Sequence, residues 1–246
     1  MEQMVIEAPV FTVEAAIKAA EFGIHRLELC SDFGEGGETP SAGNLSFLKE
    51  KISIPIYVMI RPRGGDFVYT LEELEVMRRD IGILKSLGAD GFVFGVLDKK
   101  GDVDKAACES LVNQAGGLPC TFHRAFDICK SKDQALEDII DCGFKRILTS
   151  GGENSVDLGL NNILNYLELA GERIIIIPGG GLKSGHIPQL KSTGKLREIH
   201  ASCKTFRPTE SMYFHPNVSL SNDPNAFKQV LTIDERMVIE FLRAMN

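Results

Sequence analysis

The sequence predicts a single-domain (β/α)8 barrel, also called a TIM barrel, and three observations carry this prediction. Short apolar segments with strand character alternate with helical patterns along all 246 residues. Three segments, EFGIHRLELC, SLGADGFVFG and DCGFKRILTS, share a glycine, a few polar or small residues and then an apolar strand. No linker or low-complexity stretch divides the chain, so one domain over residues 1–246 is expected.

Eight segments have the length and apolar character of buried parallel strands. In chain order they are Val5–Glu7, Arg26–Cys30, Ile54–Ile60, Gly91–Val96, Leu118–His123, Arg146–Thr149, Arg173–Pro178 and Glu198–Ser202. The alternative fold is a doubly wound open sheet, which more often has a glycine fingerprint after its first strand. Here the first strand continues into EAPVFT, and the barrel is therefore favoured.

Helices are predicted between these strands, and two of them begin with recognisable caps. Thr70 and Glu73 have the spacing of a capping box before LEELEVMRRDIGILKSLG. Ser131 and Gln134 form a weaker version before ALEDIIDCG.

The C-terminal part departs from the strand–helix alternation. Residues 207–225 are rich in Pro, Asn and Ser and predict a long loop. Thr232 and Glu235 then predict the start of a final helix over residues 232–246, where apolar residues recur at helical spacing.

Composition narrows the partners and the compartment. A net charge of −7 and a pI near 5.3 argue against nucleic acid and anionic membranes as main partners. No apolar run approaches the roughly 18 residues of a membrane span, and the N-terminus lacks a secretory signal pattern. Six scattered cysteines without a CxxC pair indicate free thiols in the cytoplasm rather than disulfides.

Strand alternation predicts which side chains face the centre of the barrel. They are Arg26, Glu28, Cys30, Tyr57, Met59, Arg61, Thr121, His123, Glu198, His200 and Ser202. Most polar members lie near the C-terminal ends of their strands, the face that carries active sites in such barrels.

Four of these inward residues form the predicted catalytic group: Glu28, Arg61, His123 and His200. A carboxylate, a guanidinium and imidazoles in one opening can bind an anion and move a proton, and Glu28 is expected to neutralise Arg61. The alternative is a buried polar network that only fixes the register of the strands.

Anion-binding candidates follow several strands. They are Arg63 and Arg124, Ser150 and Gly151 of SGGEN, and Gly179, Gly180 and Gly181 of PGGGLKSGH, with added charge from Lys183, Lys204 and Arg207. Glycines there can expose backbone N–H groups to an anion. The alternatives are an Arg124–Asp127 loop ion pair and glycines that merely form tight corners.

Cysteines are the soft ligands of the chain, and thiolates select Cu(I). Cys30 is predicted to face inward, Cys129 lies just past the fifth strand and Cys203 follows the eighth. These three are the metal-ligand candidates. The alternative is that each is an inert buried residue.

The motifs RLELC, EGGETPSAG, YVMIRPRGGDFVY, GADGFVFGVL, TFHRAFDIC, RILTSGG, PGGG and EIHAS occur in this order, and together they resemble the CutC family over most of residues 1–208. The resemblance implies a cytoplasmic TIM barrel, commonly a homo-oligomer such as a dimer or tetramer, with a role in copper homeostasis. Cys30 and Cys129 lie within matching motifs, whereas Cys203 carries less of the resemblance.

Two functions of different classes are therefore expected. One is Cu(I) binding or handling with copper as cofactor and Cys30 as the best-placed thiolate, which requires a second sulfur close to Cys30. The other is an enzyme that acts on a small phosphorylated or carboxylated metabolite. A pure interaction scaffold would leave the polar interior without a role.

Overall fold

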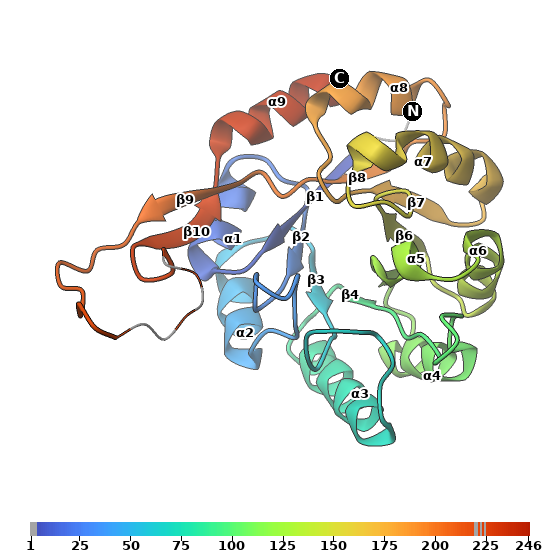
Figure 1. The fold of residues 1–246 in the computed structure, drawn as a ribbon, viewed down its shortest axis with the longest axis horizontal. Coiled ribbons are helices and arrows are strands. Elements are labelled where there is room, and N and C mark those ends of the chain that lie inside the picture. Colours follow the sequence, from blue (N-terminus) through green and yellow to red (C-terminus); the bar gives the residue numbers. More distant parts are fainter. Residues whose placement is uncertain (1–3, 219–220, 222, 224) are drawn as a thin grey trace.

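The computed structural model describes residues 4–218, 221, 223 and 225–246, and eight parallel strands form its centre (Figure 1). The barrel strands are β1 (Val5–Val10), β2 (Arg26–Leu29), β3 (Ile56–Met59), β4 (Gly91–Phe94), β5 (Cys120–Phe122), β6 (Arg146–Thr149), β7 (Ile175–Pro178) and β8 (Glu198–His200). Their order is β7-β6-β5-β4-β3-β2-β1-β8, so consecutive strands pair from β1 to β7, and β8 pairs with β1. The (β/α)8 barrel prediction is confirmed, and each predicted strand overlaps an observed one.

The ladder is continuous except at one seam. β7 and β8 lie beside each other without a registered backbone pair among the described residues. On its other side, β8 pairs with β1, and this pairing places His200 next to Glu7. β1 also pairs with β2, which places Arg26 next to Glu7 from the other side. Side chains at matched positions of parallel strands point the same way, and these three therefore meet inside the barrel.

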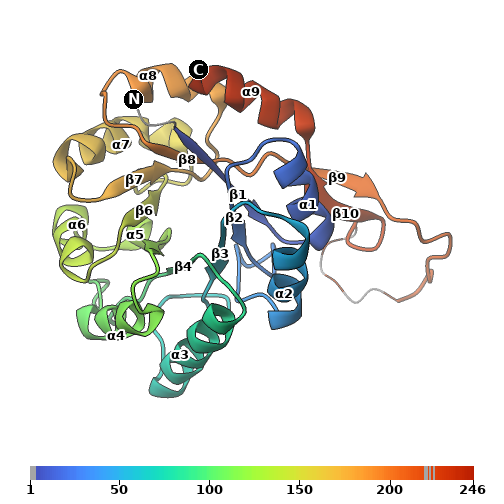
Figure 2. The same cartoon turned by 180° about the vertical axis from the view of Figure 1, so that it is seen from behind.

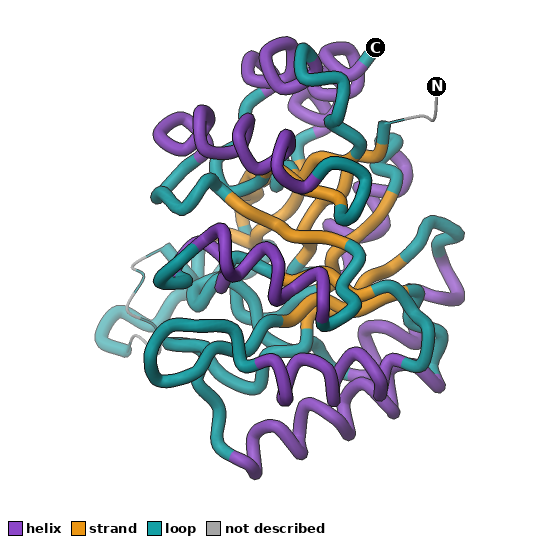
Figure 3. The backbone as a smooth tube through the Cα atoms, turned by 90° about the vertical axis from the view of Figure 1, so that its right-hand side faces the viewer, coloured by secondary structure: helices purple, strands orange, loops and turns teal. Residues whose placement is uncertain are grey.

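Helices surround the strands, as Figures 1 and 2 show from opposite sides and Figure 3 from the edge. They are α1 (Val13–Glu21), α2 (Ala42–Lys51), α3 (Leu71–Ser86), α4 (Lys105–Ala115), α5 (Ala125–Ile128), α6 (Lys132–Asp141), α7 (Val156–Ala170), the 3-10 turn η1 (Ser184–His186), α8 (Ile187–Lys191) and α9 (Glu235–Met245). Thr70 and Glu73 form the predicted capping box. Ser131 caps α6, but the side chain of Gln134 bonds to Asp138 instead of completing a box.

Burial confirms the predicted alternation of the strands. Leu27, Leu29, Val58 and Ile60 belong to the main core between strands and helices. Cys30, Tyr57, Met59 and Val93 form a separate small cluster, which lies on the inward side of their strands. The outer core is apolar, whereas the inner space mixes these residues with charged ones.

The C-terminal part differs from the sequence prediction. Residues 204–208 and 229–233 form an antiparallel hairpin, β9 (Lys204–Pro208) with β10 (Gln229–Ile233), so the predicted loop at 207–225 begins inside a strand. The hairpin projects from the barrel beside α1 (Figure 1). Thr232 lies in β10, and α9 begins three residues later because Asp234 is its N-cap. The predicted loop also contains residues 219, 220, 222 and 224, which lie outside the described residues.

Candidate functional site

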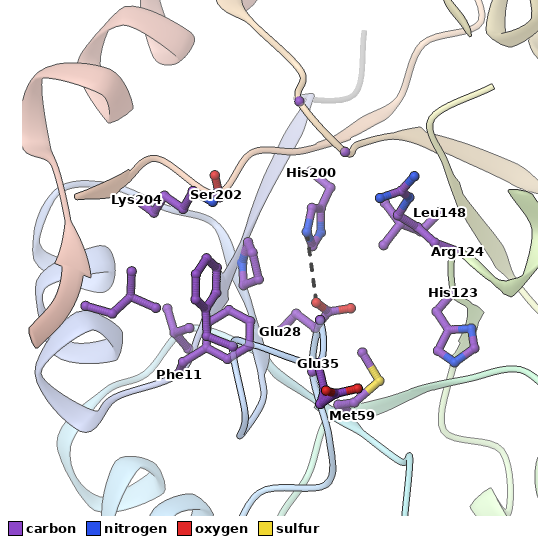
Figure 4. A pocket seen from close by; sticks show the side chains of 18 of the residues that line it. Phe11, Glu28, Glu35, Met59, His123, Arg124, Leu148, His200, Ser202 and Lys204 are labelled. Atoms are coloured by element: carbon purple, nitrogen blue, oxygen red, sulfur yellow. Dashed lines mark ion pairs between the residues drawn. The ribbon is translucent and has the colours of Figure 1, made fainter. Parts of the chain in front are cut away.

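A cavity of about 470 Å³ opens at the C-terminal ends of the strands, where Glu28, Arg61, His123 and His200 all line its wall. Figure 4 shows Glu28, His123 and His200 around it. The four residues come from β2, the end of β3, the end of β5 and β8. Strand alternation predicted this convergence. The volume of the cavity lies in the range of small-molecule binding sites.

Deeper in the barrel lies a fully paired charge network. Arg26 donates to Glu7 at 2.5 Å and also to Glu198, and Arg146 donates to the same Glu198 at 2.8 Å. The guanidinium of Arg26 stacks on the ring of Tyr57, 4.6 Å from its centroid. Burial alone would raise the pKa of the Glu7 carboxyl, but Arg26 and His200 outweigh it and lower that pKa to about 2.

A chain of titratable groups leads from this network into the cavity. His200 Nδ1 lies 2.9 Å from Glu7 Oε1, and His200 Nε2 lies 3.9 Å from Glu28 Oε2. Burial lowers the pKa of His200, but the two carboxylates outweigh it and raise that pKa above its usual value. Burial raises the pKa of Glu28 to about 7, so this carboxyl can both accept and donate a proton near neutral pH.

Glu28 also has an unused hydrogen-bonding atom. Its Oε1 is buried and has no partner among the described residues. An unsatisfied buried acceptor costs roughly 1–3 kcal/mol, which a ligand or water bound beside it would offset. In Figure 4 the carboxylate of Glu28 lies in the middle of the cavity wall, joined to His200.

Glu7, Glu28 and His200 offer ligand atoms within 4.8 Å of one another, a spacing that could hold a metal ion. In the described part of the chain no other such group of three occurs. However, the guanidinium of Arg26 already occupies Glu7 and repels a cation there. The geometry therefore favours a proton-sharing chain over a metal centre.

His123 lies on the other side of the cavity as a neutral imidazole. Burial, and then the nearby charge of Arg61, lower its pKa to about 3. Its Nδ1 accepts from the Ala125 amide at 3.3 Å, so the proton resides on Nε2, which has no partner among the described residues. The ring packs against Phe67 at 4.6 Å. His123 is thus held as a potential hydrogen-bond donor.

Arg61 does not pair with Glu28, contrary to the sequence prediction. Its guanidinium donates to backbone carbonyls of Glu35 at 2.6 Å, Gly37 at 3.1 Å and Gly65 at 2.7 Å. Carbonyl oxygens of two loops can surround a planar guanidinium as well as a carboxylate can. Arg61 therefore fastens the loop after β2 to the loop after β3, and part of its side chain lines the cavity.

The position of Arg63 differs more strongly from the prediction that it binds an anion. It points away from the cavity, where it pairs with Glu73 at 2.6 Å and Asp66 at 3.0 Å and bonds to the Val68 carbonyl. Its donors are occupied by its own loop and by the start of α3, and it is absent from the cavity lining. The structure gives it a loop-anchoring position instead.

The SGG loop after β6 is closed by a side chain from the preceding unit. Asp127 accepts from the amides of Ser150 and Gly152, and Thr149 Oγ1 accepts from Gly151. Neither Ser150 nor Gly151 lines the cavity. The predicted anion site at this loop is therefore wrong in its detail, because the carboxylate of Asp127 takes the place of the anion.

The loop after β7, unlike the loop after β6, has backbone N–H groups that are not used within the described part of the chain. Gly179 donates to the Thr149 carbonyl, but the amides of Gly180, Gly181 and Leu182 make no hydrogen bond within the described residues, and these three line the cavity. A Cβ atom on Gly180 would come within 3.0 Å of the Arg124 guanidinium, so glycine there lets Arg124 lie against the loop.

Arg124 combines the predicted ion pair with a place in the cavity wall. Its Nε donates to Asp127 at 2.8 Å and its Nη2 donates to Ser150 Oγ at 2.7 Å. Its Nη1 has no partner among the described residues, and its side chain is 42% exposed. Lys183 pairs with Asp157, whereas Lys204 lines the cavity.

The three candidate cysteines do not share a site. All are buried and free, but Cys129 and Cys203 belong to the outer core, whereas Cys30 belongs to the inner cluster. The Cys30 thiol lies 3.6 Å from Glu28 Oε2, and its pKa is raised because it is buried beside that carboxylate. The soft neighbour of Cys30 is Met59: a Cβ on Gly37 would lie 3.4 Å from Cys30 Sγ and 3.5 Å from Met59 Cε.

Sequence reasoning missed several residues of the site. Glu7 could have been found by extending the alternation to β1, where Glu7 faces inward with its neighbours in register. Phe11 and Phe33 line the cavity from loops, where strand alternation gives no information.

Comparison with known proteins settles the family. The CutC family profile matches residues 4–205. The chain belongs to the CutC family. The human copper homeostasis protein cutC homolog is 39% identical over 240 residues, which are 98% of this chain and 88% of that protein. A CutC family protein of Klebsiella pneumoniae is 41% identical over 222 residues, 90% of this chain and 89% of the relative.

A solved CutC structure shares the fold. The crystal structure of a copper homeostasis protein CutC from Streptococcus agalactiae superposes with a TM-score of 0.75 at 32% identity, over 81% of this CutC-family chain and 99% of that one. The predicted family resemblance is confirmed, and with it the family's association with copper homeostasis by name. In the described part of this CutC-family chain, none of the helices has the length and hydropathy of a membrane span.

Proposed function

We propose that this CutC-family protein binds a small anionic metabolite in the barrel mouth and transfers a proton to or from it. The observation that carries the proposal is the cavity that joins Glu28, His123 and His200 to the free amides of Gly180 and Gly181. Such a site contains a proton carrier, hydrogen-bond donors and an anion cradle, which are the parts that acid–base catalysis needs.

Each group has a role in this proposal. Glu28 accepts or donates the proton, because its pKa of about 7 leaves both forms populated at neutral pH. His200, held by Glu7 at 2.9 Å, stabilises the charged form of Glu28. His123 donates a hydrogen bond from its Nε2–H to an oxygen of the ligand, and its pKa of about 3 keeps the imidazole neutral.

A proton-transfer assay in heavy water tests this function without knowledge of the substrate. The protein is incubated in D2O with an extract of small metabolites, and deuterium bound to carbon in anionic compounds is measured by mass spectrometry after return to H2O. We expect at least one compound to gain deuterium with the wild type, and this gain to fall at least a hundredfold in Glu28→Gln.

A matched control is Glu137→Gln, which removes an exposed carboxylate outside the cavity that pairs only with Arg173 among the described residues. This variant should behave as the wild type does. Equal deuterium incorporation by Glu28→Gln, or none by the wild type across the extract, would count against the proposal.

A second candidate is Cu(I) binding, and the proximity of Met59 to Cys30 favours it. A thiolate and a thioether satisfy two-coordinate Cu(I), and both lie beside Gly37. Copper held there would supply a soft metal centre next to Glu28. The raised pKa of the thiol means that metal binding must release a proton from a buried group.

Competition with a chelator measures this copper site. We expect reduced wild-type protein to take up one Cu(I), and Cys30→Ser and Met59→Leu to weaken the uptake. Cys129→Ser is the control, because Cys129 lies in the outer core and bonds to the Ala125 carbonyl. Copper affinity unchanged in Cys30→Ser would exclude this site.

The compartment and assembly are also proposals. Six free, buried thiols support a cytoplasmic location, and the net charge of −7 supports a protein without nucleic acid or membrane as its main partner. Exposed Met212 and Tyr213 beside the hairpin support association into a dimer or tetramer. Cell fractionation and light scattering after gel filtration test both.

A further inference from the structure

The cavity has an aromatic end that proton transfer does not require. Phe11 and Phe33 line it and meet edge to face, with ring centroids 5.2 Å apart. Phe206 of the hairpin extends the row, 6.4 Å from Phe33. Phe33 remains 38% exposed although it lies in a cavity wall. An exposed aromatic ring in a concave site is a typical surface for an apolar ligand.

The loop that carries Phe33 is built to hold a fixed shape. Ser31 and Glu38 exchange backbone hydrogen bonds of 2.9 Å across its base. Asp32 adopts φ 46°, a left-handed conformation that Asp enters more readily than most non-glycine residues. Arg61 fastens the far side through the carbonyls of Glu35 and Gly37. Phe33 is therefore presented on a rigid support and does not need ordering when a ligand binds.

The other end of the cavity is suited to a negative charge. The free amides of Gly180, Gly181 and Leu182 and the unpaired Nη1 of Arg124 lie there. Lys204 lines the aromatic end instead, where its ammonium lies 4.5 Å from the Phe33 ring centroid without a carboxylate partner among the described residues. In Figure 4, Phe11 lies on one side of Glu28, and Arg124 and His123 lie on the other.

We infer that the ligand is a small anion with a flat ring, which stacks at Phe11 and Phe33 while its anionic group binds the Gly180–Leu182 loop and Arg124. This inference rests on the proposed anion-binding function and names its substrate class. A cavity of about 470 Å³ accommodates one ring with one phosphate or carboxylate group. The ring end selects the ligand, and the charged end positions it with its middle beside Glu28.

Calorimetric titration with simple probes tests the inference, in low salt with EDTA present. Phenyl phosphate should bind about tenfold more tightly than inorganic phosphate or cyclohexyl phosphate, which has a ring of similar size that is not flat. Benzoate and acetate form a parallel pair, which shows whether the anionic group is a phosphate or a carboxylate.

Two single variants separate the ends of the site. Phe33→Ala should lose the preference for phenyl phosphate while its affinity for inorganic phosphate stays within twofold of wild type. Arg124→Ala should weaken all the anions at least fivefold. Phe47→Ala is the matched control, since Phe47 is 43% exposed on α2, outside the cavity, and should change neither affinity.

The outcomes distinguish the inference from the function beneath it. If phosphate binds and the ring adds nothing, or if Phe33→Ala keeps the preference, the aromatic end is not a binding surface and the inference fails alone. If no probe of either pair binds, the anion site fails and the proposed function fails with it. Thermal unfolding of each variant confirms that it is folded.

Discussion

The interior of the barrel contains two polar regions that differ in how completely they are paired. In the deep region, Arg26, Glu7, Glu198 and Arg146 satisfy one another. In the mouth, Glu28 Oε1, His123 Nε2 and Arg61 Nε are buried without partners in the described part of the chain. The first region contributes stability and register, whereas the second keeps unpaired groups that a ligand can use.

The largest expected effect comes from breaking the paired region. Arg26→Met removes the shared guanidinium and leaves Glu7 and Glu198 as buried, poorly compensated charges. We expect a loss of about 3–5 kcal/mol in the free energy of unfolding, measured with urea. Arg173→Met, which breaks an exposed pair, should remain close to wild type. A loss below about 1 kcal/mol for Arg26→Met would remove the distinction between the two regions.

Acid should weaken the same region through Glu7. Its folded pKa is about 2, below the usual 4.5, so its stabilising contribution is present above pH 4.5 and is lost as the pH falls toward 2. Glu7→Gln should therefore be less stable than wild type by about 3 kcal/mol at pH 6, and the difference should shrink toward pH 3. Urea unfolding at several pH values measures it. A difference that does not change with pH would contradict the pairing.

Glu28 should behave in the opposite way. Its folded pKa of about 7 lies above 4.5, so its favourable contribution is present below pH 4.5 and is lost as the pH rises through 7. Glu28→Gln imitates the protonated form. It should equal wild type near pH 4.5 and exceed its stability by about 1–3 kcal/mol at pH 8, while losing activity. Destabilisation at pH 8 would show that the carboxylate is structurally paired after all.

The smallest effect is expected at Arg63, outside both regions. Its partners Glu73 and Asp66 are partly exposed, so Arg63→Ala should cost less than about 1 kcal/mol. Phosphate affinity, measured by calorimetry, should stay within twofold of wild type. A fall as large as that of Arg124→Ala would place Arg63 in the anion site, as its sequence position first suggested.

Strand alternation predicted most of the side chains that face the barrel interior, because a strand has only two faces and the sequence shows which of them is apolar. It placed Arg26, Glu28 and His200 in the barrel interior, where all three are buried and Glu28 and His200 line the cavity. It could not choose hydrogen-bond partners: Arg61 was assigned to a carboxylate, but loop carbonyls surround it. Loop closure depends on contacts far apart in the sequence, and alternation does not describe them.

The same reason explains the errors in the loops. Ser150 and Gly151 look like an anion cradle, but Asp127 from the preceding unit fills it. The β9–β10 hairpin was missed because its middle has loop composition, while the short strands at its ends pair only with each other. The Thr232 capping pattern was overruled by that pairing, and Asp234 became the cap.

All six thiols are buried, so their chemical modification can measure local unfolding of the protein. Local unfolding must expose a buried cysteine before an alkylating reagent can modify it, so the labelling rate measures how often the surrounding structure opens. Cys30 faces the barrel interior, and the other five cysteines pack between the strands and the helices. The order in which they are modified would therefore reveal whether the barrel mouth or the helical layer unfolds first.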